Sequence, residues 1–232
     1  TGGSVYWNGG GVWVRERQAG QTEMEYQMRN WYYFNWLCGD HIVEQHVHNI
    51  DVANWFLGET PISAQGMGGR EVRDDKETGQ IFDHHFVEFK YESGAVISSQ
   101  CRHQKGCWNQ VNEILQGTEG TVNTGPGEIT DLDGKRLYMH DSEEDPNPYQ
   151  VEHDELFAAI REGKVINNSE STAMSTMSSI RGRMASYSGE LITVAEAVDN
   201  GRVLVRVERE GGVRGAAGGG GGRGGLWAGA GR

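Results

Sequence analysis

The sequence lacks long apolar runs and has few cysteines. A membrane-spanning helix needs about 18 or more consecutive apolar residues, and the sequence contains no such run. The three cysteines, Cys38, Cys101 and Cys107, are odd in number and form no close CxxC pair. This pattern argues against both a disulfide framework and a structural zinc ribbon. We therefore expect free thiols, which are compatible with a reducing compartment.

Basic side chains are also scarce, since 21 Lys and Arg stand against 33 Asp and Glu, for a formal net charge of −12. The negative electrostatic field of such a chain repels the phosphates of nucleic acids and anionic lipid headgroups. Neither nucleic acid nor a membrane surface is an expected partner. The chain begins at Thr1 rather than Met, so any targeting signal would lie upstream. We expect a cytoplasmic location and leave export open for that reason.

Short β-rich runs alternate with turn residues between 62 and 129, which predicts a meandering sheet. The turns 92–94 and 119–120 make the runs on either side of them antiparallel partners. A further strand is expected within 4–14, where aromatic and β-branched residues surround a glycine triplet. The expected runs in the meander are 62–72, 82–91, 95–102, 109–117 and 120–124.

One uninterrupted helix is expected over 40–57. No Pro or Gly occurs in this segment, Asp40 can cap its N-terminus, and Gly58 follows its end. The preceding segment 23–37 has aromatic residues at both helical and strand spacing, and we interpret it as a loop leading into a helical turn.

Helical periodicity returns at 151–162 and 170–187, with Ser169 as a cap for the second helix. The side chains of the first helix that would face a core are Leu156, Phe157 and Ile160. Both helices are expected to cover one face of the sheet. The fold class is therefore α+β, with a large, predominantly antiparallel open sheet and helices on one face.

The domain is expected to span residues 1–205. The remainder, 206–232, is rich in glycine and too poor in apolar side chains to offset the entropy lost on ordering. We expect a disordered tail there.

Histidine is concentrated in the segment GDHIVEQHVHNID. At about 100° per residue on one helix, His41, Glu44, His48 and Asp51 fall within an arc of roughly 80°, while His46 points to the opposite side. Glu44 lies four residues before His48, and a carboxylate on one imidazole nitrogen raises the basicity of the other. The pair is a candidate general base, able to take a hydroxyl proton while the carbon beneath it loses hydride.

Two other interpretations of this cluster stay open. The residues could be exposed helix positions, or satisfied polar groups that hold the helix to its neighbours. Alternatively His41, Glu44 and His48 could bind a metal ion, as helical zinc sites do. Three ligands strung over two helical turns do not easily reach one ion, so we predict no metal for this set.

Further polar residues could bind sugar hydroxyls, with Trp31 or Trp108 as a stacking surface. The candidate substrate-binding residues are Arg29, Asn30, Trp31, His41, Arg102 and His103. His84 and His85 occupy neighbouring positions of one strand and so point to opposite faces of the sheet. We expect both to be structural.

The segment GDHIVEQHVHNIDVANWFLG resembles the C-terminal domain of the glucose-fructose oxidoreductase, inositol dehydrogenase and rhizopine-catabolism (Gfo/Idh/MocA) family. The resemblance covers about residues 3–200 and takes in VYWNGGGVW, MRNWYYF, GMGGREV, FDHHFVEFKYESG, SQCRHQKGCW and GRMASYSGE. It implies an upstream Rossmann domain for NAD or NADP. It also implies homo-oligomerisation through the sheet and a catalytic pair on the first helix.

The family's pattern of an acid, three spacers, His, acid or Asn, any residue and Asp falls on Glu44, His48, Asn49 and Asp51. Members usually have Asp at the first of these places, and Glu44 is one methylene longer. No GxGxxG follows a strand, and the family's Glu-Lys-Pro segment is absent. We therefore expect this chain alone to be inactive and to bind NAD poorly.

The resemblance implies that the intact parent protein is an NAD(P)-dependent oxidoreductase acting on a CH–OH group of a sugar or polyol, with His48 as general acid/base. Two alternatives stay open. Relatives of the family include glycosidases that keep NAD bound and release a sugar without net reduction. The domain could also act without catalysis, as an oligomerisation or sugar-binding module.

Overall fold

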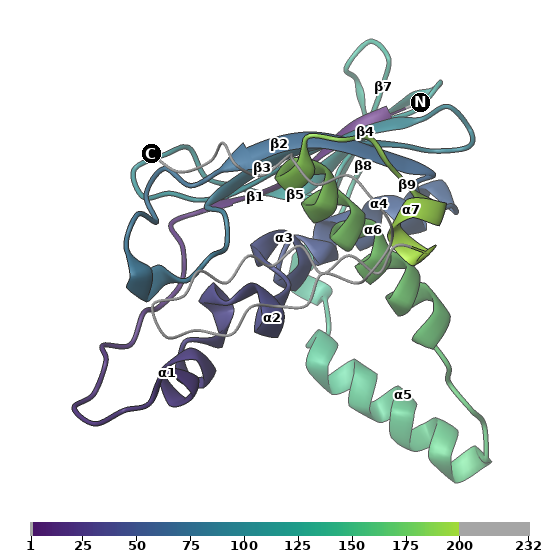
Figure 1. Ribbon diagram of the computed structural model, residues 1–232. Coiled ribbons are helices and arrows are strands. Elements are labelled where there is room, and N and C mark those ends of the chain that lie inside the picture. Colours follow the sequence, from purple (N-terminus) through teal and green to yellow (C-terminus); the bar gives the residue numbers. More distant parts are fainter. Residues whose placement is uncertain (1, 200–232) are drawn as a thin grey trace.

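The computed structural model describes residues 2–199 (Figure 1). The glycine-rich tail predicted for 206–232, and the domain end predicted at 205, lie outside the described residues.

Nine strands form one open sheet in the order β8-β7-β6-β5-β1-β4-β3-β2-β9. Every neighbouring pair is antiparallel except β1 and β4, which run parallel. The strands are β1 Gly2–Gly9, β2 Ser63–Gly69, β3 His84–Lys90, β4 Val96–His103, β5 Gln110–Gln116, β6 Gly120–Asn123, β7 Glu128–Asp131, β8 Arg136–Met139 and β9 Ile192–Thr193. The predicted open, predominantly antiparallel sheet is confirmed.

The five runs predicted in the meander correspond to β2 to β6, and the N-terminal run corresponds to β1. The turns at 92–94 and 119–120 join antiparallel partners as expected. The position of β1 was not predicted: it separates β4 from β5 and pairs with both. The short strands β7 and β8 were not predicted either.

The helices gather on one side of the sheet (Figure 1). They are α1 Glu23–Arg29, α2 Asn35–Cys38, α3 His41–Glu44, α4 Val47–Leu57, α5 Pro148–Glu162, α6 Ser169–Ser188 and α7 Val194–Asp199. Short 3-10 turns occur at Trp31–Tyr33, Lys76–Thr78 and Ser142–Glu144. Among residues 2–199, none of the helices has the length and apolar character needed to cross a bilayer.

The main core lies between the sheet and helices α3, α4 and α6. The strands contribute alternate side chains, as period-two geometry requires, and the helices contribute their apolar sides. Gly182 lets α6 approach β3 closely, because a Cβ there would lie 2.8 Å from Cζ of Phe89. The core includes Val5, Ile42, Ile50, Val87, Phe89, Ile97, Met184 and Ala185.

A second, aromatic cluster packs beneath α1 and α2. Its buried members are Tyr26, Tyr32, Tyr33, Phe34, Cys38 and Ile81. Residues 23–37, expected to be a loop leading into a helical turn, are largely helical from Glu23 onward. Thr22 and Glu25 form a capping box at the start of α1, in which each side chain accepts a hydrogen bond from the other residue's backbone N–H.

Helix α5 was predicted correctly in position but not in packing. Leu156, Phe157 and Ile160 are 47%, 49% and 62% exposed, and α5 projects away from the sheet (Figure 1). Periodicity identifies an amphipathic helix, but it does not identify what covers the apolar side.

The prediction that Ser169 caps the last long helix was wrong. The N-cap of α6 is Asn168, and the Asn168 side chain makes no capping hydrogen bond.

Candidate active site

The helix predicted over 40–57 is interrupted at Gln45 and His46, which separate α3 from α4. In one straight helix, positions 41 and 46 would point about 140° apart, so both could not face the sheet. The break allows both, and His41 and His46 are completely buried. The predicted common polar face is therefore wrong: His41 is buried, whereas His48 and Asp51 are exposed.

A buried chain of hydrogen bonds holds the first turn of α4, the turn that carries His48. The Asn49 amide donates to Oε1 of Glu113 at 2.5 Å, so its Oδ1 accepts from Nδ1 of His46 at 3.2 Å. Nε2 of His46 is then the acceptor for the Ser99 hydroxyl at 2.8 Å. The Thr124 hydroxyl donates to the second oxygen of Glu113. Each member thus has a defined donor or acceptor role.

Burial lowers the pKa of His46 to about 3, outweighing the hydrogen bond with Asn49 that raises it. The ring is therefore neutral near pH 7, in agreement with one nitrogen donating and the other accepting. Because this neutral ring joins α4 to β4, the backbone beside His48 is tied to the sheet.

Glu44 lies half-buried at the end of α3. Burial raises its pKa, while the charge of His48 and the hydroxyl of Tyr32 act in the lowering direction. Within residues 2–199 no hydrogen bond joins Glu44 to His48, and neither Oε2 of Glu44 nor the Tyr32 hydroxyl makes a regular one. The two predicted catalytic residues therefore interact electrostatically without a hydrogen bond between them.

Asp40, which immediately precedes α3, is a buried carboxylate surrounded by donors. It is the one non-glycine residue in the described part of the chain with a positive φ, 77°. Its Oδ1 accepts from the His41 backbone at 2.5 Å, and its Oδ2 accepts from the Phe82 backbone at 3.0 Å and the Tyr187 hydroxyl at 2.5 Å. Burial alone would raise the pKa of Asp40, but His85 and His41 hold it well below its usual value.

Three imidazoles pack beside this carboxylate. The rings of His41 and His103 are stacked with centroids 4.6 Å apart, and those of His41 and His85 are 4.9 Å apart. Sequence analysis placed His41 and His103 among the substrate-binding residues and treated His85 as structural. The three buried rings form one cluster, which His84 does not join because it is half-exposed on the other face of β3.

His103 also borders a cavity of about 280 Å³. Its Nδ1 accepts from Arg73 at 3.0 Å and its Nε2 donates to Gln45 at 3.1 Å. Burial lowers the pKa of His103 to about 2, and the neighbouring His41 and Arg73 act in the same direction. The cavity is lined by Gly10, Gly11, Val12, Tyr33, Val72, Arg73, Thr78, His103 and Lys105. Arg73 and Lys105 were not singled out from the sequence, although Lys105 lies within the quoted motif SQCRHQKGCW.

The other predicted substrate-binding residues are scattered. Asn30 is completely buried and its side chain bonds to the backbone of Arg15 and Tyr26, which removes it from any surface a sugar could reach. Trp31 is partly exposed at 36%, and Arg29 is half-buried. Arg102 donates to the carbonyl of Trp108. None of these four borders the cavity beside His103.

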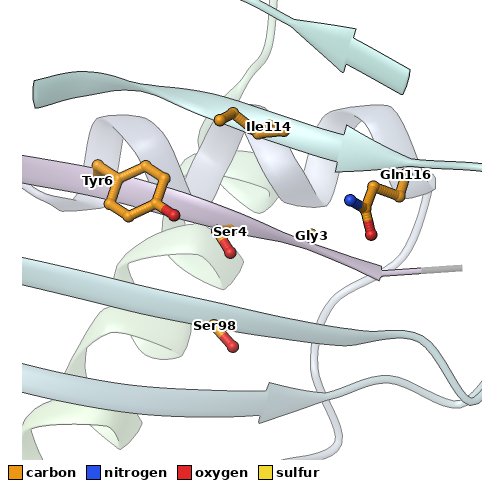
Figure 2. Close-up of a pocket in the computed structure, with 6 residues that line it drawn as sticks. All are labelled: Gly3, Ser4, Tyr6, Ser98, Ile114 and Gln116. Carbon is orange, nitrogen blue, oxygen red and sulfur yellow. The ribbon is translucent and has the colours of Figure 1, made fainter. Parts of the chain in front are cut away.

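A second hollow, of about 400 Å³, lies on the face of the sheet away from the helices (Figure 2). It is lined by Gly3, Ser4, Tyr6, Ser98, Ile114 and Gln116 from β1, β4 and β5. No titratable group other than the Tyr6 phenol borders it, so it offers little for acid–base chemistry.

The chain belongs to an oxidoreductase family: a sequence model of the family's C-terminal alpha/beta domain matches residues 12–217. The family predicted from GDHIVEQHVHNIDVANWFLG is thereby confirmed, through a Gfo/Idh/MocA domain match. No curated protein sequence matches the chain.

Several solved structures share the fold. An aldose-aldose oxidoreductase from Caulobacter crescentus has a TM-score of 0.59 at 14% identity, with 83% of this chain and 55% of that chain covered. A myo-inositol 2-dehydrogenase from Lactobacillus plantarum has a TM-score of 0.56 at 15% identity, with 83% of this chain and 55% of that chain covered. A putative myo-inositol dehydrogenase from Sinorhizobium meliloti 1021 has a TM-score of 0.52 at 20% identity, with 84% of this chain and 56% of that chain covered. The chain thus spans little more than half the length of these proteins.

Proposed function

We propose that this domain is the substrate-binding half of an NAD(P)-dependent oxidoreductase that acts on a CH–OH group of a sugar or polyol, with His48 as general acid/base. The observation that carries the proposal is the position of His48: it is an exposed imidazole at the start of α4, next to the buried Asn49. Family membership and sugar- or polyol-oxidising relatives such as the inositol dehydrogenase support the reaction class.

The described residues do not fit the phosphates of a dinucleotide. The glycines that follow β1 lead into a segment without regular secondary structure, and α1 does not begin until Glu23, whereas a dinucleotide-binding turn leads directly into a helix N-terminus. The nucleotide is therefore assigned to a part of the parent protein outside this chain. The nicotinamide bound there would supply the hydride acceptor for the substrate carbon.

The residues of this chain handle the proton. His48 accepts the proton of the substrate hydroxyl as the carbon is oxidised, and returns it in the reverse direction. Glu44 stabilises the imidazolium that forms on His48 through the electrostatic interaction between the two side chains. His46, Asn49 and Glu113 hold the helix turn, so that the imidazole needs little rearrangement during the reaction.

The test uses the parent protein with its nucleotide-binding domain and follows NAD(P)H formation with a panel of sugars and polyols. His48→Ala is expected to lower kcat by about 10² to 10⁴. His153→Ala is the matched control, because His153 on α5 is also an exposed helical histidine. Because His48 is exposed, its replacement should leave the melting temperature unchanged. Undiminished turnover in His48→Ala would refute the assignment.

The same panel distinguishes the glycosidase alternative by its products. Net cofactor reduction supports a dehydrogenase, whereas release of a sugar without net reduction supports a glycosidase. Comparison of NAD with NADP in this assay identifies the preferred cofactor.

A further inference from the structure

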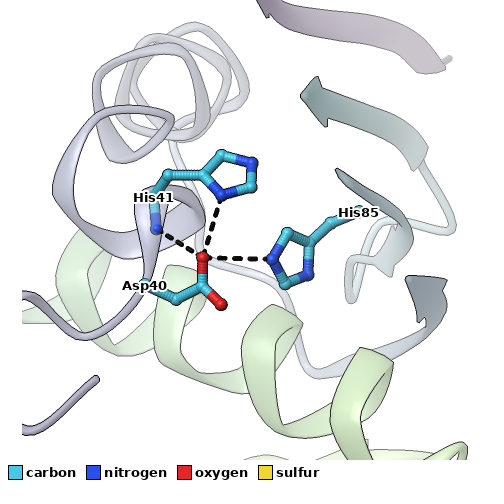
Figure 3. A group of neighbouring side chains, drawn as sticks. All are labelled: Asp40, His41 and His85. Atoms are coloured by element: carbon cyan, nitrogen blue, oxygen red, sulfur yellow. Dashed lines mark hydrogen bonds and ion pairs between the residues drawn. The ribbon is translucent and has the colours of Figure 1, made fainter. Parts of the chain in front are cut away.

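We propose that Asp40, His41 and His85 form a binding site for a divalent transition-metal ion of the zinc class. One ligand atom from each residue lies within 4.8 Å of the others, and all three residues are buried (Figure 3). The site joins the start of α3 to β3 and is separate from the exposed His48. The proposal does not depend on the proposed oxidoreductase function.

Buried ring nitrogens without a regular hydrogen bond are the first observation. Nε2 of His41 has none, and Nδ1 of His41 and Nε2 of His85 have none either but face Oδ1 of Asp40 at 2.9 and 3.3 Å, and all three nitrogens are shielded from solvent. A buried polar atom without a partner destabilises a protein, because it loses its hydrogen bonds to water and gains none in the fold. Such atoms concentrated around one carboxylate indicate a missing positive partner.

The hydrogen bonds of His85 show which of its nitrogens carries a lone pair. The Ser186 hydroxyl donates to the carbonyl of Arg183 at 3.1 Å, so its oxygen accepts from Nδ1 of His85 at 2.7 Å. In the neutral ring Nε2 is then unprotonated. It faces Oδ1 of Asp40 at 3.3 Å. Two electron-rich atoms in a buried site repel each other unless a proton or a metal cation lies between them, and the tautomer set by Ser186 leaves that place to a metal cation.

The distances suit a metal ion. Oδ1 of Asp40 lies 2.9 Å from Nδ1 of His41 and 3.3 Å from Nε2 of His85. In a tetrahedral zinc site with bonds of about 2.0–2.1 Å, neighbouring ligand atoms are about 3.3 Å apart. Two imidazole nitrogens and a carboxylate oxygen form a donor set that zinc and its first-row neighbours accept.

Outer hydrogen bonds orient two of the three ligands. Oδ2 of Asp40 accepts from the Tyr187 hydroxyl and the Phe82 backbone, and Oδ1, which accepts from the His41 backbone, is directed at the two rings. Nδ1 of His85 is held by Ser186. Such outer partners set the tautomer and orientation of the ligands in metal sites.

The experiment is a metal titration of this chain. Since the ligands are buried, the chain is unfolded with a chelator present, transferred to metal-free buffer and refolded with Co²⁺. We expect visible d–d absorption that saturates at one ion per chain and disappears when Zn²⁺ is added. Zn²⁺ should also raise the melting temperature of the metal-free protein.

Three variants assign the site. His85→Gln should abolish the Co²⁺ absorption, and Tyr187→Phe should weaken binding by about tenfold through loss of one outer hydrogen bond. His84→Gln is the matched control, because His84 is the neighbouring histidine on the opposite face of β3, and it should bind as the unmodified chain does.

The proposal is overturned if the folded chain gives no Co²⁺ absorption and no thermal shift with Zn²⁺, in which case a proton occupies the space between Asp40 and His85. It is equally overturned if a folded His85→Gln binds unchanged. If His85→Gln does not fold, Tyr187→Phe decides, because it removes one oxygen atom and keeps the ring. Unaltered affinity in Tyr187→Phe would then reject the site.

Discussion

Mild acid is expected to destabilise this domain through its buried neutral histidines, and His46 allows the magnitude to be worked out. The pKa of His46 falls from its ordinary 6.5 to about 3 because the ring is buried. Below pH 6.5 the unfolded chain binds a proton at this residue and the folded chain does not, so the free energy of unfolding decreases as the pH falls. This loss continues until the pH reaches about 3.

At pH 4.5 the unfolded imidazole is two pH units below its pKa. His46 alone should then lower the free energy of unfolding by about 3 kcal/mol relative to pH 7, at 1.36 kcal/mol per unit. Domains of this kind have a total stability of about 5–15 kcal/mol, so the effect is a large fraction of it. His103, with its pKa at about 2 through burial, acts in the same direction over the same range.

Urea denaturation at several pH values between 7 and 4.5, followed by the fluorescence of the seven Trp residues, measures this loss. His46→Gln cannot titrate, so its stability should change by about 3 kcal/mol less than that of the unmodified chain over this range. Equal pH dependence in the two proteins would refute the reasoning. If His46→Gln does not fold, NMR titration of the unmodified chain provides the test, because the His46 ring signal should not move above pH 4.5.

Three further substitutions test the packing by urea denaturation at pH 7. Gly182→Ala should destabilise the domain by about 1–2 kcal/mol, since the new Cβ would lie 2.8 Å from the Phe89 ring and the crowding outweighs the better helix propensity. Phe89→Ala should lower the free energy of unfolding by about 3–5 kcal/mol, because the ring is completely buried in the core. Phe157→Ser should change stability by less than about 0.5 kcal/mol, because this ring on α5 is 49% exposed. A large loss of stability in Phe157→Ser would show that α5 packs against the domain in solution.

The strands could be predicted because their signals are local. In β3 and β4 every second residue is buried, and the turn between them contains Gly94, whose φ is 84°. The position of β1 could not be predicted, since its parallel pairing with β4 joins residues far apart in sequence. The strands β7 and β8 are four residues long, and each of their side chains is at least partly exposed. They therefore carry no alternating pattern to recognise.

The polar groups of the candidate site were harder to predict. Periodicity assumes that a helix continues, whereas the helix breaks at Gln45 and His46, and His46 there bonds to Ser99 on a strand distant in sequence. The sequence indicated that Asp40 caps a helix, and Asp40 does accept from the His41 backbone. No sequence pattern indicated that the same carboxylate would also accept hydrogen bonds from the Phe82 backbone and the Tyr187 hydroxyl.

The break between α3 and α4 also explains why so many histidines occur in one short segment. Residues before the break turn His41 toward the sheet and the buried carboxylate of Asp40, whereas residues after it place His48 at the surface. His46, at the break, makes its hydrogen bonds to Ser99 on the sheet and to Asn49 in α4. Three nearby imidazoles thus have three environments, and environment determines the chemistry of each. Of these three rings only that of His48 is exposed, whereas the buried ring of His46 joins α4 to the sheet through its hydrogen bonds.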